Sequence, residues 1–375
     1  MRIGLVVTGG VDRSVRERVM PVLLWLVERL SRQHELHVFA LHHEARPATY
    51  SLLGATVHDL GRVSAPPGLR RFVQRRRLLR AVNAIGGVDV LHGYWGLPGA
   101  AAVYVAEHIG VPSVVTANSG EFVSLPDIGY GLQRRWIDRR AVHFATSRAS
   151  AVTVATTFMQ RLAKQHGVDA RVIPMGLPRQ LDSHGNDVLP ARPPDGPPWR
   201  LMHVASINRV KDHDTLLRAM ADVVARVPEV HVDIVGADTR DGHVAAMIEA
   251  LQLRQHVTLH GFLTNDALAP LWARAHLHVV SSLHEAAGVV TLEAAVAGVP
   301  TVGTNVGYIA DGAPHRSVAV PVGNATALAS AVINLMNNPE RRATLASTAR
   351  TWALAHDADL TAEAFGALYR EVTNA

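Results

Sequence analysis

The sequence predicts an α/β protein with two doubly wound parallel-sheet domains and a cleft between them. Short apolar runs rich in β-branched residues alternate with longer helical patterns along the whole chain. Several of these runs are apolar at every position, which is typical of parallel strands that are buried on both faces. The length of 375 residues also favours two domains over one.

The composition excludes several functional classes. The apolar fraction of 48% and the charged fraction of 18% indicate a chain that folds around hydrophobic cores. The absence of Cys excludes disulfides, thiolate metal sites and a catalytic thiol. No apolar run approaches the about 18 residues of a membrane-spanning helix, and the N-terminal run is too short for a secretory signal. We therefore expect a cytoplasmic protein.

The first domain is predicted over residues 1–181. A strand at 3–7 ends in Gly9-Gly10, and we expect this turn to open the first helix. A glycine pair at the end of a strand lets the backbone approach a phosphate or an acceptor group, although many turns use such pairs. Further strands are predicted at 35–41, 55–60, 88–95 and 112–118.

The chain changes character after the first domain. Residues 182–199 contain five prolines and no apolar periodicity, so they are predicted to be a linker. The alternation of strands and helices then restarts in a second domain at 200–355. Its strands are predicted at 200–207, 231–237, 257–263, 276–282 and 300–304, with a helix at 266–275 and a last helix at 359–372.

One segment of the second domain is the most informative. Its pattern is a strand, a loop with Glu285 and Gly288, and a helix that begins near Val289. The backbone N–H groups of Gly288, Val289 and Val290 are expected to bind an anion, with the positive end of the helix behind them. Glu285 and Glu293 would flank that anion and accept hydrogen bonds from sugar hydroxyls. The alternative is that Glu293 only gains from the helix dipole and that Glu285 is an ordinary loop charge.

Lys211 is a second candidate in this domain. It follows a predicted strand and precedes a helix, where its charge can neutralise a phosphate leaving group. The alternative is an exposed lysine at the end of a helix.

These segments resemble the retaining glycosyltransferases of family 4, which have the GT-B fold. The resemblance implies two Rossmann-like domains, of which the first binds an acceptor and the second a nucleotide-sugar donor, and a C-terminal helix at 356–375 that returns to the first. It also implies that Glu293 holds the ribose hydroxyls, that Glu285 contacts the transferred sugar and that the amides after Gly288 bind the diphosphate. The matching residues are Lys211, Ser282, Glu285, Gly288, Leu292, Glu293, Ala294, Ala297, Gly298 and Pro300.

The chain departs from the family pattern at two places. The family's arginine falls on Ser206, and Arg209 is expected to replace it as a catalytic residue beside Lys211. On the acceptor side, Asn118 stands where the family often has a histidine, and Glu121 takes the acidic position. Loss of the histidine does not exclude catalysis, because the leaving phosphate can take the proton from the acceptor.

Weaker assignments complete the predicted site. Gly236, Gly261 and Phe262 are assigned to donor binding, with ordinary turn glycines as the alternative. His92 joins the Gly9-Gly10 pair on the acceptor side, with a core position as the alternative.

Arginines concentrate at residues 68–82 and contribute to an excess of 37 Lys and Arg over 32 Asp and Glu. The stretch has the pattern of a basic amphipathic helix, which can lie on an anionic membrane. The alternative is a solvated helix that packs on the sheet. Peripheral contact at the inner membrane face therefore stays open, whereas nothing in the chain resembles a nucleic-acid recognition module.

Together these features predict a retaining hexosyltransferase. It would move a sugar from a UDP- or GDP-sugar to a sugar or lipid-linked acceptor alcohol, in glycan, polysaccharide or glycolipid synthesis. Asp357 and Asp359 lie away from any strand end and are interpreted as helix-capping acids, so neither a metal nor a cofactor is expected. The alternatives are a nucleotide-sugar epimerase, a sugar phosphorylase, and a catalytically degenerate nucleotide-sugar-binding protein.

Overall fold

The computed structural model describes residues 1–179, 193 and 195–375, which form two compact units. Unit one comprises Met1–Pro178 and His356–Ala375, and unit two lies within Arg179–Ala355. Of the predicted linker at 182–199, residues 182–192 and 194 lie outside the described residues. No helix of the described residues is long and apolar enough to cross a membrane.

Unit one is built on an eight-stranded sheet in the order β3-β4-β2-β1-β5-β6-β7-β8. Neighbouring strands are parallel, except for the antiparallel pair β3–β4. In the central strand, Leu5 pairs with Val38 on one side and with His92 on the other. The strands are β1 (Arg2–Val7), β2 (Glu35–Ala40), β3 (Ala48–Leu52), β4 (Ala55–Asp59), β5 (Val90–Tyr94), β6 (Ser113–Thr116), β7 (Ala151–Val154) and β8 (Arg171–Val172).

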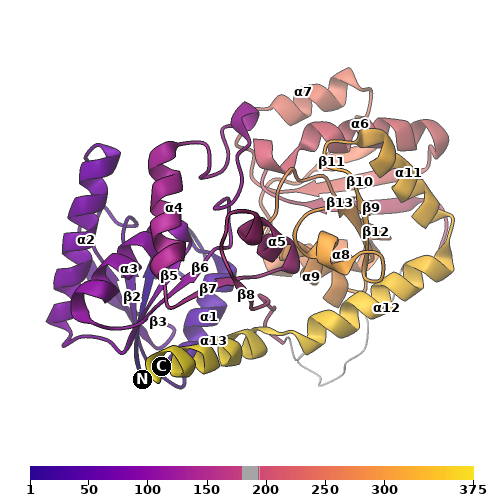
Figure 1. Ribbon diagram of the computed structural model, residues 1–375. Helices are drawn as coiled ribbons and strands as arrows, with labels where there is room; N and C mark the ends of the chain where they lie inside the picture. Colours follow the sequence, from indigo (N-terminus) through magenta and orange to yellow (C-terminus); the bar gives the residue numbers. More distant parts are fainter. Residues whose placement is uncertain (180–192, 194) are drawn as a thin grey trace. The chain divides into compact units, whose positions relative to one another are not determined.

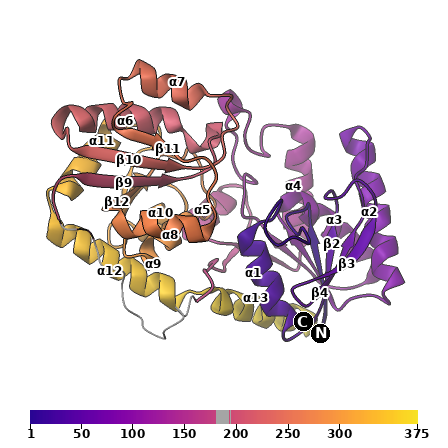
Figure 2. The same ribbon diagram turned by 180° about the vertical axis from the view of Figure 1, so that it is seen from behind.

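Helices cover both faces of this sheet (Figures 1 and 2). On one face α3 packs between α2 and α4, and on the other α1 packs against α13. The side chain of Asp357 caps α13 by accepting a hydrogen bond from the N–H of Leu360 over 2.9 Å. The helices are α1 (Pro21–Ser31), α2 (Pro67–Ala84), α3 (Gly96–Ile109), α4 (Trp136–Arg148), α5 (Thr157–Gln165) and α13 (Ala358–Thr373), with a 3-10 turn η1 (Pro126–Ile128).

Unit two is built on a six-stranded parallel sheet in the order β11-β10-β9-β12-β13-β14. Its strands are β9 (Trp199–Val204), β10 (Val230–Val235), β11 (Val257–Leu259), β12 (Leu277–Val280), β13 (Thr301–Thr304) and β14 (Ser317–Val320). Its helices are α6 (His213–Arg226), α7 (His243–Ala250), α8 (Asn265–Arg274), α9 (Val290–Val296), α10 (Gly307–Gly312), α11 (Ala325–Met336) and α12 (Pro339–Ala355), with a 3-10 turn η2 (Arg209–Lys211).

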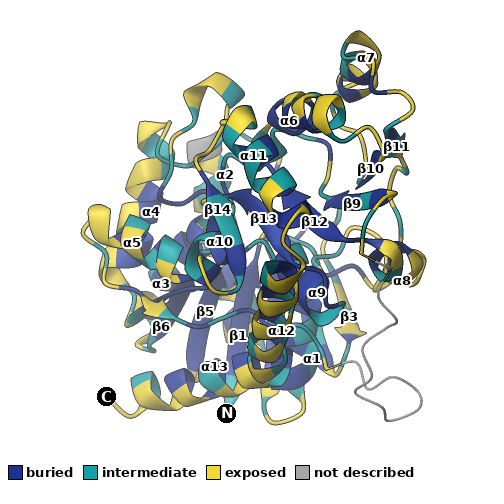
Figure 3. Cartoon of the chain, turned by 90° about the vertical axis from the view of Figure 1, so that its right-hand side faces the viewer, coloured by how far each residue is buried: buried dark blue, intermediate teal, exposed yellow. Residues whose placement is uncertain are grey.

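Each sheet is buried between its helices, as the dark blue strands and yellow outer helix faces of Figure 3 show. In unit two, α6 and α11 pack on one side of the sheet, and Trp272 of α8 and Ala294 of α9 pack on the other. In unit one, Ile3, Leu5 and Val6 of β1 are all fully buried. Strands that are apolar at every position are thus covered on both faces, and the predicted fold class is confirmed.

One local prediction is wrong, because the Gly9-Gly10 turn does not open the first helix. α1 begins only at Pro21, which supplies the fixed φ that suits a first helical position. Before it, Gly10 (φ 85°) and Arg18 (φ 52°) adopt left-handed conformations that interrupt any helix. Met20 N donates a hydrogen bond to Gly10 O over 3.0 Å, so this segment closes as a loop at the carboxyl end of β1.

Candidate functional site

The loop after β12 carries the charged centre of unit two. One carboxylate oxygen of Glu285 accepts hydrogen bonds from the Nζ of Lys211 and from the Oγ of Ser282, the latter over 2.7 Å. The side chains of Lys211 and Glu285 are 23% and 15% exposed, so the ion pair is largely shielded but still reaches the surface. The structure therefore brings two of the three predicted catalytic residues together.

Local contacts hold Lys211 in this position. It ends the turn η2, whose amides are capped by the side chain of Asn208. The Oγ of Ser281 donates a hydrogen bond to Lys211 O over 2.8 Å. The turn after β9 is thus fastened to the residue that follows β12, and this explains why Lys211 meets a glutamate that is 74 residues away in the chain.

The two glutamates of this site differ in their electrostatic surroundings. Burial by itself raises the pKa of Glu285, but the charge of Lys211 and the hydrogen bonds from Lys211 and Ser282 outweigh it and hold the pKa below its usual range. Glu293, in the first turn of α9, has no side-chain partner among the described residues, and burial raises its pKa. A ligand that donates hydrogen bonds to Glu293 would offset this cost of burial.

Gly288 shapes the entry into α9. Its φ of 77° is left-handed and favours glycine, whereas a Cβ added there would make only an ordinary contact of 3.5 Å with the Glu285 Cγ. The N–H groups of Gly288, Val289 and Val290 donate no hydrogen bond within the part of the chain that the structure describes. Three free donors therefore lie on the same loop as Glu285, where they are able to bind an anion.

Gly307 supports this loop, and this glycine was not identified from the sequence. A Cβ at Gly307 (φ 50°) would lie 2.4 Å from Ala287 O, so only glycine permits this approach. The N–H of Tyr308 donates a hydrogen bond to the same oxygen over 2.7 Å. The available signal was the position of this glycine, just after the predicted strand at 300–304.

Two buried histidines beside Lys211 were also missed. The rings of His203 and His213 meet edge to face, with their centroids 4.8 Å apart, and the Nδ1 of His203 lies 2.8 Å from Val279 O. Burial lowers the pKa of His203 to about 4 and that of His213 to about 2. Both imidazoles are therefore neutral near pH 7 and do not repel Lys211.

The remaining predicted donor residues lie at other points on the carboxyl edge of this sheet. The side chain of Arg209 is exposed and has no partner among the described residues, so the structure does not bring it to Glu285. Gly236, after β10, donates a hydrogen bond to Gly261 O over 2.8 Å. Phe262 follows and is 71% exposed, so its ring is available for contact.

The predicted acceptor residues of unit one divide between surface and core. Gly9 and Gly10 are half-buried in the loop after β1. His92 is fully buried, and its ring nitrogens contact the hydroxyl groups of Tyr369 at 2.6 Å and Thr116 at 2.7 Å. These contacts join α13 to the sheet, and they leave the imidazole out of reach of a surface ligand.

Asn118 and Glu121 both have structural partners. The Oδ1 of Asn118 accepts a hydrogen bond from Ala155 N over 2.7 Å. The carboxylate of Glu121 is fully buried and accepts hydrogen bonds from Gly96 N at 3.0 Å and Ser119 N at 2.7 Å. Burial raises the pKa of Glu121 in spite of these bonds. Asn118 thus fixes the loop after β6 to the residue that follows β7, and Glu121 fixes it to the start of α3. The contact of either side chain with an acceptor stays a prediction.

One group in unit one has the spacing of a metal site. Oxygen or nitrogen atoms of Asp12, His43 and Glu44 lie within 4.8 Å of one another. Arg18, however, donates hydrogen bonds to both carboxylates, to that of Glu44 over 3.1 Å. Because the guanidinium of Arg18 already bridges both carboxylates, we interpret the group as an ion-pair network that fastens the loop after β1.

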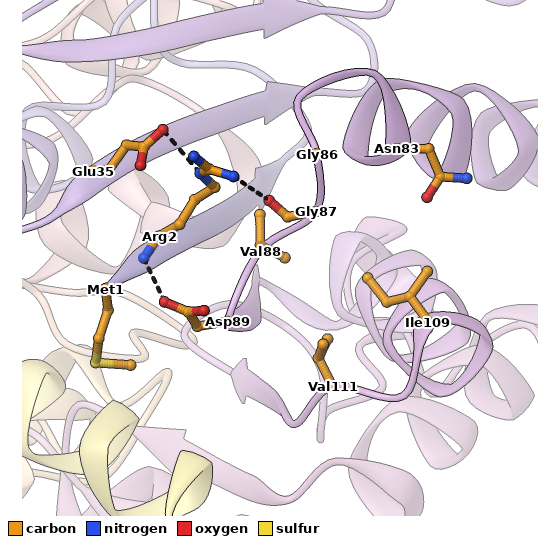
Figure 4. A pocket seen from close by; sticks show the side chains of 10 residues that line it. All are labelled: Met1, Arg2, Glu35, Asn83, Gly86, Gly87, Val88, Asp89, Ile109 and Val111. Carbon is orange, nitrogen blue, oxygen red and sulfur yellow. Dashed lines mark hydrogen bonds and ion pairs between the residues drawn. The ribbon is translucent and has the colours of Figure 1, made fainter.

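Two hollows lie at the amino ends of the sheets. In unit one, a hollow of about 510 Å³ surrounds Arg2, whose N–H donates to Asp89 over 2.7 Å and whose Nε lies 2.8 Å from Glu35 (Figure 4). In unit two, a hollow of about 420 Å³ is lined by Arg342 and Asp195, which pair at 2.6 Å. Because these charges satisfy one another, neither hollow is assigned a ligand.

Two family models match the chain. The model of the glycosyl transferases group 1 matches residues 190–352, and the model of the glycosyl transferase 4-like domain matches residues 19–176. Among curated relatives, the D-inositol 3-phosphate glycosyltransferase of Rhodococcus jostii is 27% identical over 356 residues, which cover 88% of this chain and 77% of that protein.

Solved structures agree with this assignment. Sucrose-phosphate synthase from Thermosynechococcus elongatus has a TM-score of 0.75 at 19% identity, with 99% of this chain and 98% of that chain covered. HepE from Anabaena, in complex with UDP, has a TM-score of 0.73 at 16% identity, with 99% and 100% covered. The chain therefore belongs to the group 1 glycosyltransferases, which are family 4 enzymes, and its two Rossmann-like domains have the GT-B fold.

Proposed function

We propose that the chain is a retaining hexosyltransferase that uses a UDP-sugar and a hydroxyl acceptor. The observation that carries the proposal is the grouping of the Lys211–Glu285 pair, the free amides after Gly288 and the isolated carboxylate of Glu293. UDP is favoured over GDP because the similar HepE structure contains UDP. The acceptor is a sugar or lipid-linked alcohol, and the name of the Rhodococcus relative adds a phosphorylated polyol to this class.

In this proposal unit two binds the donor and unit one the acceptor. Glu293 accepts hydrogen bonds from the ribose hydroxyls, and the amides of Gly288, Val289 and Val290 hold the diphosphate. Lys211 neutralises the charge that develops on the diphosphate as the glycosidic bond breaks. The acceptor hydroxyl then adds to the same face of an oxocarbenium-like sugar, and its proton passes to the leaving phosphate.

A panel of nucleotides and nucleotide sugars tests the proposal. At a hundredfold excess over Kd, a ligand that binds only the folded state stabilises it by about 2.7 kcal/mol, so UDP should raise the melting temperature clearly. GDP and ADP should raise it less. Incubation with UDP-sugars and hydroxyl acceptors should then give transfer with retained anomeric configuration.

The same assays separate the alternatives. An epimerase would release a changed nucleotide sugar without any acceptor, and a phosphorylase would need inorganic phosphate. A degenerate binding protein would bind UDP but neither transfer nor slowly hydrolyse the sugar. Failure of UDP to bind at all would contradict the proposed donor site.

We further propose that unit one contacts an anionic membrane through α2 and the start of α4. Leu69, Phe72 and Trp136 are 57%, 51% and 65% exposed. Arg71, next to Phe72, donates a hydrogen bond to Ile137 O over 3.0 Å, so the two apolar sites are neighbours. Exposed aromatic side chains among arginines have the chemistry of an interfacial surface.

Removing the two aromatic rings should weaken membrane contact. We expect the double variant Phe72→Ser, Trp136→Ser to bind phosphatidylglycerol vesicles at least about tenfold more weakly in cosedimentation, because two buried rings contribute several kcal/mol. The control Val322→Ser changes an apolar side chain of unit two that is 43% exposed, and it should bind like the wild type. Equal binding of wild type to phosphatidylcholine vesicles would contradict the role of charge.

A further inference from the structure

The arginines of α2 differ in what they contact, and among the described residues one of them is half-buried without a partner. Arg71 is paired with Asp138, Arg77 donates to Leu60 O over 2.7 Å, and Arg75 lies over the ring of Tyr104 at 4.8 Å. Arg76 lies over the ring of Phe72, and Arg80 is exposed. Arg70 is half-buried and has no partner among the described residues. A shielded guanidinium without a counter-charge is costly, so Arg70 needs an explanation.

Arg70 lies one helical turn before a residue of α2 that contacts the segment after β2. One helical turn after it, the Nε2 of Gln74 donates a hydrogen bond to Leu41 O over 3.1 Å, and residues four apart share a face of a helix. The residue after Leu41 is His42, whose backbone N–H donates to Thr8 O over 2.9 Å. The Nδ1 of His42 is buried and has no hydrogen-bond partner in the described part of the chain.

Arg62 reaches the same place from the end of β4. Its N–H donates to Glu44 O over 2.9 Å, and its Nε donates to His43 O over 3.3 Å, which leaves its two terminal nitrogens free among the described residues. Burial lowers the pKa of His42, the charges of Arg70 and Arg62 lower it further, and the charge of Asp59 raises it, so the field of both guanidinium groups reaches this ring.

The acidic group beside these residues does not neutralise them. Asp59 is 2% exposed, and its two carboxylate oxygens accept hydrogen bonds from Gly61 N at 2.8 Å and Glu44 N at 2.9 Å. Those backbone amides occupy the carboxylate, and neither Arg62 nor Arg70 forms an ion pair with it. Two free guanidinium groups and one unpartnered imidazole nitrogen therefore gather at the edge of the sheet that also carries Gly9.

We propose that His42, Arg62 and Arg70 form an anion site that holds a phosphate group of the acceptor. Guanidinium groups bind phosphate through paired N–H donors. The half-buried position of Arg70 strengthens such bonds, whereas Arg62 is exposed and reaches the same place from the surface. The assignment to the acceptor rests on the proposed function, whereas the phosphate site itself does not. The phosphate belongs either to a soluble acceptor or to a lipid headgroup, since both present the same oxygens.

Calorimetric titration of the full chain with sn-glycerol 3-phosphate tests the site. We expect wild type to bind it, and glycerol not to bind measurably. Arg62→Gln and Arg70→Gln should each weaken binding about tenfold, and the double variant about a hundredfold. Arg70→Lys should recover part of the loss, because it keeps the charge without the planar fork.

Two control variants test whether the binding of sn-glycerol 3-phosphate comes from an exposed arginine of α2 or from the proposed donor site instead. Arg80→Gln removes an exposed arginine of the same helix and should bind sn-glycerol 3-phosphate like wild type, and so should Lys211→Met, which alters the proposed donor site. Vesicles with phosphatidylglycerol identify the source of the phosphate: weaker binding by the double variant indicates a lipid headgroup, and unchanged binding indicates a soluble acceptor.

Titration of UDP into the same samples tests the donor site of the proposed function separately from the phosphate site. UDP binding by a wild type that does not bind sn-glycerol 3-phosphate overturns this site and leaves the donor assignment intact. Equal affinity of wild type and the double variant, with both folded by circular dichroism, also overturns it. If wild type binds sn-glycerol 3-phosphate but not UDP, the proposed donor is overturned and the phosphate site stands.

Discussion

Replacing Lys211 by Met is expected to lower kcat for sugar transfer by about 100- to 1,000-fold. One preorganised charge or donor aimed at a developing negative charge contributes about 2.7–4 kcal/mol to catalysis. Lys211 is held for this task by the turn η2 and by Glu285, so its Nζ has little freedom to lose on reaching the transition state. Initial rates under saturating donor measure the change.

The chain supplies a matched control. Its other lysine, Lys164, is exposed in α5, and Lys164→Met should transfer sugar at the wild-type rate. A Lys211→Met variant whose kcat lies within threefold of wild type would exclude the electrostatic role of Lys211.

The loss of folding stability in Lys211→Met should depend on pH. The lowered pKa of Glu285 contributes folding stability above the usual glutamate pKa of about 4.3, and this contribution is lost as the pH falls through the lower folded value. Without Lys211 the carboxylate loses its counter-charge and keeps the hydrogen bond from Ser282, so the destabilisation should be largest near pH 7 and shrink in acid. Adding Glu285→Gln removes the stranded charge and should restore stability, but not kcat.

The loop that carries Glu285 and Gly288 could be predicted from the sequence because its signals are local. A buried strand, polar residues, a glycine and a helix that ends before Pro300 lie within one short stretch of chain. The contact of Lys211 with Glu285 depends instead on sheet order. β9 and β12 are neighbours although β10 and β11 separate them in the chain, and no local pattern specifies that order.

The acceptor side was harder to predict for the same reason. His92 lies in a buried strand and bonds to Tyr369, which is 277 residues away, so its surroundings cannot be inferred from neighbouring residues. The edge strand β3 alternates between half-buried and exposed positions before its buried last residue, and it lacks the apolar run that marks the central strands. In the sequence, Arg70 is one of several arginines in the stretch 68–82, because the contacts that distinguish it lie on other elements.

Replacing Glu293 by Gln is expected to weaken UDP binding by about 10- to 100-fold and to stabilise the folded protein. Hydrogen bonds to a charged group contribute about 1.5–3 kcal/mol, and the amide keeps only part of that in a ribose contact. The stabilisation follows because burial raises the pKa of Glu293, so its ionised form destabilises the fold. Calorimetry with UDP and thermal melts between pH 4 and pH 8 measure both effects.

The pH dependence distinguishes this explanation from a general effect of the substitution. Because folding raises the pKa of Glu293, its ionised form costs folding stability at pH values above the raised pKa. This cost disappears below the usual glutamate pKa, where the carboxyl is protonated in both states. The gain in Glu293→Gln should therefore be largest at pH 8 and vanish near pH 4, whereas Glu229→Gln, at an exposed position of unit two, should change neither stability nor UDP affinity. UDP binding by Glu293→Gln as tight as that of wild type would contradict the assignment of a ribose contact to Glu293. A buried charge that costs stability and serves a ligand is a trade of stability for function.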